Sequence, residues 1–128
     1  MIPPDDIQMY ECAEAILWKE KGEVIFVKNN EGTYVDVEHQ KQKFSLIKEL
    51  AGNKPHRLIV DISGVKGVSR EGREYTGLIE HRVYIRSIAL LVSTPLSRII
   101  GTFIMKVNRP NLPTKLFTNL DKAKKWLV

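Results

Sequence analysis

An apolar run that ends in an acid, a hydroxyl and a glycine constrains this chain more than any other feature. Residues 58–62 read Leu-Ile-Val-Asp-Ile, and Ser63 and Gly64 follow. An apolar run without polar alternation is typical of a strand that is covered on both faces, as in parallel sheets. Such a strand brings Asp61 and Ser63 to the carboxyl edge of the sheet, where α/β domains place their binding surfaces. The segment after Asp61 is therefore the first candidate for a functional surface.

Strand-like and helix-like segments alternate along the rest of the chain. Runs of β-branched and aromatic residues predict strands, and apolar residues near helical spacing predict helices. Asp36, Ser69 and Thr94 are predicted helix N-caps, because their side chains can accept a hydrogen bond from the backbone of the first turn. The predicted elements are strands at 15–18 and 24–27, a helix at 37–51, a strand at 58–62, a helix from Ser69 to about Val83, a strand at 88–92, a helix at 95–107, a strand at 115–117 and a final helix that includes 123–127.

The order β-β-α-β-α-β-α-β-α predicts an α/β fold with a mixed, mostly parallel sheet that begins with an antiparallel hairpin. At 128 residues the chain is long enough to bury one core and too short for two. We expect a single domain over residues 14–128. Residues 1–13, which begin with prolines and acids, are expected to form a flexible lead-in.

Composition restricts the classes of partner and the cellular compartment. The formal charge of +5 comes from dispersed Lys and Arg residues, with no stretch in which aromatic residues alternate with them, so nucleic acid is not expected as a partner. No apolar run approaches the ~20 residues of a membrane span, and the N-terminus does not resemble a secretory signal. The single cysteine, Cys12, cannot form an internal disulfide. We therefore expect a cytoplasmic protein without a membrane span.

No motif for catalysis, cofactor binding or metal binding is found in the sequence. His39, His56 and His81 lie far apart and fall in no metal-binding spacing. A nucleophile elbow, a phosphate-binding glycine loop and a nucleotide-binding fingerprint are also missing from the sequence. We expect a protein that is not an enzyme and that uses no cofactor and no metal.

The element order and the run at 58–65, which leads through a short loop into a helix, resemble the STAS domain. This is the fold of anti-sigma factor antagonists and of the cytoplasmic tails of sulfate transporters. The segments 113–117 and 123–127 also resemble the last strand and helix of a STAS-like branch of small bacterial proteins. The resemblance covers about residues 14–128 and implies a regulatory module that binds a partner protein.

In the antagonists, this strand is followed by a loop that reads Asp-Ser-Ser-Gly, whose second serine is phosphorylated by a partner kinase. Alignment at Asp61 and Gly64 places Ser69-Arg70-Glu71-Gly72 on that loop, so Glu71 stands at the position of the phospho-acceptor. A carboxylate carries about one negative charge, whereas phosphoserine carries about 1.5 to 2. The resemblance therefore implies a module without the switch of the family. Such a module binds its partner constitutively or is controlled in another way. Ser69, which stands at the family's aspartate position, is the hydroxyl nearest to the acceptor position.

Five residues form the candidate partner-binding or regulatory set: Asp61, Ser63, Ser69, Arg70 and Glu71. Each type of residue also has a structural explanation. An aspartate after a strand can accept backbone N–H groups of the following turn, and a serine can cap a helix. Charged residues in a first helical turn can simply lie on a solvated face.

The predicted helix at 95–107 supports other hypotheses, because its apolar stripe is wide. A helix that is apolar almost all round is typically sandwiched in a core or in a dimer interface, so a homodimer is one expectation. The alternative function is a carrier or sensor of a small apolar ligand or lipid, which predicts a closed cavity against this helix. The apolar residues are Leu96, Ile99, Ile100, Phe103, Ile104, Met105 and Val107.

Overall fold

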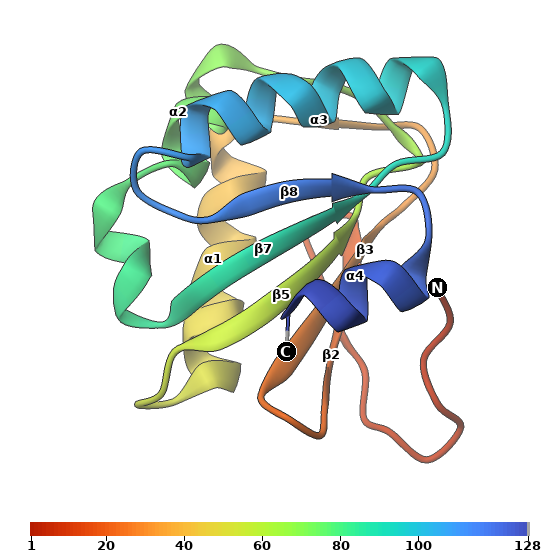
Figure 1. The fold of residues 1–128 in the computed structure, drawn as a ribbon, viewed down its shortest axis with the longest axis vertical. Coiled ribbons are helices and arrows are strands. Elements are labelled where there is room, and N and C mark those ends of the chain that lie inside the picture. The colour runs from red at the N-terminus through yellow and green to blue at the C-terminus, as the bar shows by residue number, and fades with distance from the viewer. Residues whose placement is uncertain (128) are drawn as a thin grey trace.

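Six strands form a central sheet in the computed structural model, which describes residues 1–127 (Figure 1). The first three strands in spatial order pair antiparallel, and the pairings from the third to the sixth are parallel. This arrangement confirms the predicted α/β class with a mixed, mostly parallel sheet. In spatial order the strands are β1 (Tyr10–Cys12), β2 (Ala15–Glu20), β3 (Val24–Asn29), β5 (His56–Asp61), β7 (Ile85–Leu91) and β8 (Thr114–Phe117).

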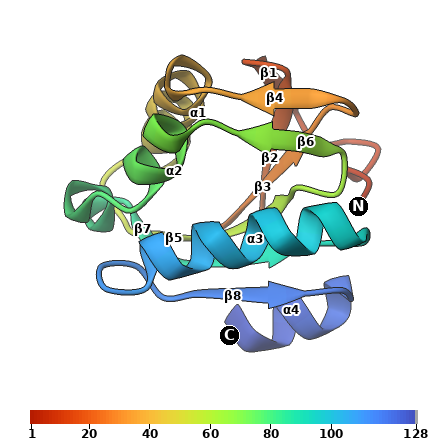
Figure 2. The ribbon, with the colours of Figure 1, turned by 90° about the horizontal axis from the view of Figure 1, so that it is seen from above.

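Helices cover both faces of the sheet (Figures 1 and 2). One face carries α1 (Val37–Ala51), α2 (Arg70–Thr76) and α3 (Pro95–Asn108), whereas α4 (Leu120–Leu127) packs on the other. A short 3-10 helix, η1 (Ile79–Val83), connects α2 to β7. No helix in the described residues is both long enough and apolar enough to cross a membrane.

The predicted N-caps are present on α1, α2 and α3. Asp36 accepts a hydrogen bond from the His39 N–H at 2.9 Å, and Thr94 accepts one from the Ser97 N–H at 3.0 Å. Ser69 caps α2, but this helix ends at Thr76, earlier than the predicted end near Val83. Gly77 follows Thr76, and glycine disfavours a continued helix; the backbone goes on as η1.

Two short strands that were not predicted form a second sheet. The strand β4 (Thr33–Val35) pairs in parallel with β6 (Val65–Val68). This second sheet lies on the same side of the central sheet as α1 and α3 (Figure 2). Part of the predicted loop after Asp61 is therefore a strand, and it is held by the Ser69 N–H, which donates to the Val35 carbonyl at 2.8 Å.

The central sheet separates two apolar cores. The larger core lies between the sheet and the layer formed by α1, the second sheet and α3. The smaller core lies beneath α4, where the rings of Trp18 and Phe26 stack at 5.2 Å. Met1 and Ile7 pack against this smaller core, and Tyr10–Cys12 forms β1, so the lead-in has defined contacts. The mobility of residues 1–13 stays a prediction.

Candidate functional site

Asp61 is the last residue of β5, and Ser63 lies in the turn that follows. The Asp61 Oδ1 accepts a hydrogen bond from the Ser63 N–H at 2.9 Å, and the Asp61 carbonyl accepts one from Asn29 Nδ2 at 3.0 Å. The turn continues through Gly64, where a Cβ would lie only 2.9 Å from the Glu31 Cα. The Asp61 carboxylate therefore holds the backbone of the turn, which is the structural role expected of an aspartate at such a position.

Ser69, Arg70 and Glu71 lie together at the start of α2. The Ser69 Oγ accepts a hydrogen bond from the Gly72 N–H at 3.0 Å, so the serine serves as the helix cap. The exposed Arg70 donates from Nε to Glu74 Oε1 at 3.0 Å. Glu71 is also exposed, and a carboxylate in the first turn is favoured by the partial positive charge of a helix N-terminus.

The strand β6 separates these two groups of predicted residues. Its four residues span about 13 Å, and one group precedes this strand whereas the other follows it. The structure thus brings Asp61 together with Ser63, and Ser69 together with Arg70 and Glu71. It does not bring all five residues into one cluster.

Helix α2 instead lies beside exposed apolar side chains of α3. Leu96, Ile99 and Phe103, which we call the α3 apolar face, are 49%, 55% and 53% exposed. Arg73 on α2 joins the two helices, because its guanidinium Cζ lies 5.8 Å from the centre of the Phe103 ring. The same guanidinium donates from Nη1 to the Val68 carbonyl at 2.9 Å, which fixes its position. Arg73 therefore links α2 to the Phe103 end of the α3 apolar face.

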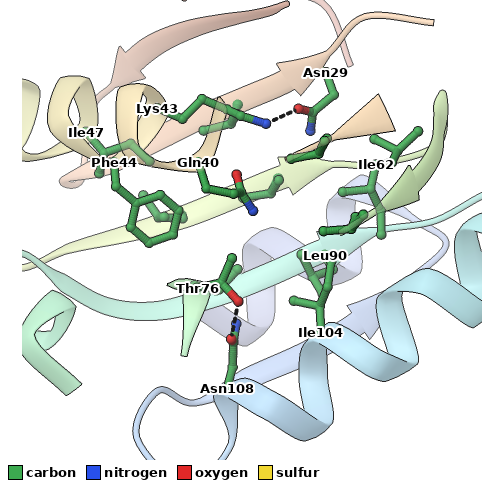
Figure 3. A pocket seen from close by; sticks show the side chains of 17 residues that line it. Asn29, Gln40, Lys43, Phe44, Ile47, Ile62, Thr76, Leu90, Ile104 and Asn108 are labelled. Carbon is green, nitrogen blue, oxygen red and sulfur yellow. Dashed lines mark hydrogen bonds between the residues drawn. The ribbon is translucent and has the colours of Figure 1, made fainter. Parts of the chain in front are cut away.

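A second candidate binding site is a cavity inside the molecule, between the central sheet and the layer of α1, β6 and α3 (Figure 3). This cavity has a volume of about 50 Å³. One water needs about 10–15 Å³, so the cavity has room for about three to five water-sized groups. Pockets for drug-sized ligands have volumes of about 300–1,000 Å³. A cavity does lie against α3, as the carrier hypothesis predicts, but its size does not support a lipid as the cargo.

Lys43 on α1 is a buried cation in the wall of this cavity. Its side chain is 4% exposed, and Nζ donates to Asn29 Oδ1 at 2.7 Å. Among the described residues, no carboxylate lies within 4 Å of this ammonium. Burial lowers the pKa of Lys43 to about 8, although the negative charges of groups such as Glu14 and Asp36 act in the opposite direction.

Asn108 and Thr76 form the opposite wall. The Asn108 side chain is fully buried, its Oδ1 accepts from the Thr76 hydroxyl at 2.7 Å, and its Nδ2 has no hydrogen-bond partner. The Thr76 hydroxyl also lies 2.7 Å from the Arg73 carbonyl. One hydroxyl hydrogen cannot serve two acceptors fully, so at least one polar atom of the Asn108 amide lacks a full partner.

The sequence contains a signal for these cavity residues. Gln40 and Lys43 complete the helical spacing of Phe44 and Ile47, so they occupy the apolar face of α1. Asn108 likewise continues the buried stripe of α3 one turn after Ile104. A polar residue on an apolar stripe identifies a buried polar group, but it does not show that two such groups face one cavity.

The chain matches a family model that is described as a domain of unknown function, DUF7793, over residues 17–128. The chain belongs to the DUF7793 family. No curated protein matches this DUF7793 chain. Within residues 1–127, no group of three or more His, Cys, Asp or Glu side chains is placed to hold a metal ion.

Two solved structures resemble the DUF7793 chain over nearly its whole length. An uncharacterised protein of the DUF3478 family from Shewanella loihica PV-4, with a SpoIIAA-like fold, has a TM-score of 0.62 and 15% identity, with 100% of both chains covered. An anti-sigma factor antagonist from Mycobacterium paratuberculosis has a TM-score of 0.55 and 16% identity, with 99% of this chain and 98% of that chain covered. These likenesses confirm the predicted STAS-like fold.

Proposed function

We propose that this DUF7793 chain is a non-catalytic regulatory module that binds a partner protein. The docking surface comprises the start of α2, with Ser69, Arg70 and Glu71, and the α3 apolar face. The observation that carries the proposal is the exposure of Leu96, Ile99 and Phe103, together with the contact between Phe103 and Arg73 of α2. Apolar side chains that cluster on a surface, bordered by charged groups, are typical of protein interaction sites.

The charges around the α3 apolar face favour a partner with an acidic rim. The two charged residues of α3, Arg98 and Lys106, are both basic and exposed, and Arg73 stacks on the apolar face itself. Complementary charge at the rim of an interface raises the association rate and selects among partners. The Asp61–Ser63 turn lies at the other end of β6 from this surface. We therefore propose that it stabilises the local fold and does not contact the partner.

Glu71 stands at the position of the antagonists' phospho-acceptor serine. The proposed binding therefore does not require phosphorylation of this position by a kinase. A carboxylate keeps its negative charge without modification. Unphosphorylated recombinant protein is therefore expected to bind the partner. A partner that binds only after phosphorylation of the protein would contradict this part of the proposal.

Quantitative capture from host cells tests the docking surface. The double variant Arg70→Glu/Glu71→Lys and the variant Ile99→Ser are expected to lose a polypeptide that the wild type enriches. Controls are Arg86→Glu, another exposed arginine, and Ile2→Ser, an isoleucine that is 84% exposed. Equal enrichment of the same polypeptide by all variants would exclude the proposed surface.

A second copy of this chain is the alternative partner for the α3 apolar face. Analytical ultracentrifugation of the purified wild type and of Ile99→Ser distinguishes the two cases. A monomer at micromolar concentration favours a different protein as the partner. A dimer that Ile99→Ser converts to monomer would assign the face to self-association instead.

A further inference from the structure

The internal cavity combines a positive charge, an unpaired amide and apolar walls. Gln40 and Lys43 are three residues apart on α1 and therefore lie on the same side of that helix. In Figure 3 the Gln40 side chain points into the cavity, between Lys43 on one side and Asn108 on the other. The remaining walls are mostly aliphatic, with Ile62 and Ile104 among them.

The chemistry at Lys43 favours an anionic ligand. An ammonium has three hydrogen-bond donors, and the Asn29 amide oxygen takes one of them at 2.7 Å. A buried charge is costly unless it is paired, and no acidic side chain among residues 1–127 lies within 4 Å of this one. A carboxylate at Lys43 would supply the opposite charge, and the Gln40 amide lies beside it as a further donor.

Asn108 provides a second and independent indication of a ligand. Its side chain is 0% exposed, and its Nδ2 has no partner in the protein. An unpaired buried amide costs about 1–3 kcal/mol, which a ligand with a hydrogen-bonding group can offset. Because Asn108 is on α3 and Lys43 is on α1, the two polar ends of the cavity come from different helices.

The size and the walls of the cavity determine the class of ligand. Its volume of about 50 Å³ admits about three to five non-hydrogen atoms. Apolar walls between two polar ends favour a molecule that has an alkyl part as well as a charge. We propose that the cavity binds a short-chain carboxylate, with its carboxylate at Lys43 and Gln40 and its alkyl part against Ile62 and Ile104. This site is separate from the docking surface and does not depend on the proposed function.

Titration of isotope-labelled protein followed by nuclear magnetic resonance tests the site. The probes are acetate, propionate and glycolate, with acetamide as a neutral analogue of acetate and sodium chloride at equal ionic strength as a salt control. The three carboxylates are expected to cause saturable shifts of the side-chain amide signals of Asn29 and Asn108. Glycolate is expected to bind more tightly than propionate, because its hydroxyl can pair with the Asn108 amide.

Two variants with the same change of charge make the test specific. Lys43→Met is expected to weaken the affinity for acetate by about tenfold or more, because it removes a charge-assisted hydrogen bond. Lys48→Met, on the exposed side of the same helix, is expected to leave that affinity unchanged. The proposal is overturned if the shifts do not saturate, if chloride or acetamide reproduces them, or if Lys43→Met binds acetate as the wild type does.

A measurement on the wild type alone covers the case in which Lys43→Met does not fold. With ¹³C-labelled acetate, nuclear Overhauser effects are expected between the acetate methyl group and the methyl groups of Ile62 and Ile104. If these effects are missing at saturating acetate, the cavity does not hold the ligand and the proposal is wrong.

Discussion

Replacing Lys43 with methionine tests whether a buried ammonium makes the stability of this fold depend on alkaline pH. Lys43 is 4% exposed, and burial lowers the pKa of its ammonium from 10.5 to about 8. Between these two pKa values the folded chain releases the proton while the unfolded chain keeps it. Raising the pH through this window therefore favours the folded state, whereas below about pH 8 both states are protonated and the contribution does not change.

The magnitude follows from the two pKa values. A shift from 10.5 to about 8 corresponds to at most about 3 kcal/mol in the free energy of unfolding. Between pH 7 and pH 9.5, the release of this proton raises the free energy of unfolding of the wild type by about 2 kcal/mol. Lys43→Met has no proton to release, so the stability of the wild type should rise by about 2 kcal/mol relative to this variant over that range.

Urea unfolding at pH 7 and pH 9.5, followed by tryptophan fluorescence, measures the effect, since Trp18 is fully buried. Burial also raises the pKa of Cys12, Tyr75 and Tyr84, which lowers stability at high pH. Tyr75 and Tyr84 are common to wild type and variant, but the charge of Lys43 lowers the pKa of Cys12, so Lys43→Met changes that group as well. Both proteins therefore carry Cys12→Ser in this comparison, and the difference between them then isolates Lys43. Lys48→Met should follow the wild type. A difference between wild type and Lys43→Met that stays constant between the two pH values would show that Lys43 does not release its proton in the folded chain.

Other predictions concern the cap, the aromatic cluster and the docking surface. Ser69→Ala should lower the free energy of unfolding by about 1 kcal/mol in urea, whereas Ser69→Asp should retain most of it as an alternative cap. Tyr84→Phe should cost about 1–2 kcal/mol, because the Tyr84 hydroxyl donates to His81 Nδ1 at 2.7 Å while His81 Nε2 donates to the Tyr75 carbonyl. Burial lowers the pKa of His81, so the urea midpoint should fall as the pH drops below about 6.5, where the unfolded chain takes up the proton first. Ile99→Ser should change stability by less than about 0.5 kcal/mol and still abolish capture of the partner.

Much of the fold could be predicted because its longer elements carry strong local signals. The run at 58–62 is apolar on both faces, and the structure places it as β5 near the centre of the sheet. Asp36, Ser69 and Thr94 act as caps through hydrogen bonds to backbone groups three residues away, so the sequence alone contains both partners. Local chemistry of this kind does not depend on the rest of the chain.

The second sheet and the cavity could not be predicted, because they depend on contacts between distant segments. Three or four residues are too few to show a period, so β4 and β6 carry no clear pattern, and each forms only because the other lies beside it. Lys43 and Asn108 are 65 positions apart in the numbering and meet one cavity only in the folded chain. The separation of Ser63 from Ser69 likewise follows from β6, which the sequence did not reveal.

The packing of the first residues beneath α4 also determines how the molecule can be tethered. Met1 and Ile7 contact the same small core as Ala123 and Leu127, so both ends of the described chain lie on the side of the sheet opposite α3. A sensor surface or a fused reporter attached through either end would leave the α3 apolar face directed outward. Binding assays can therefore use an anchor at either terminus without covering the helices that are expected to meet the partner.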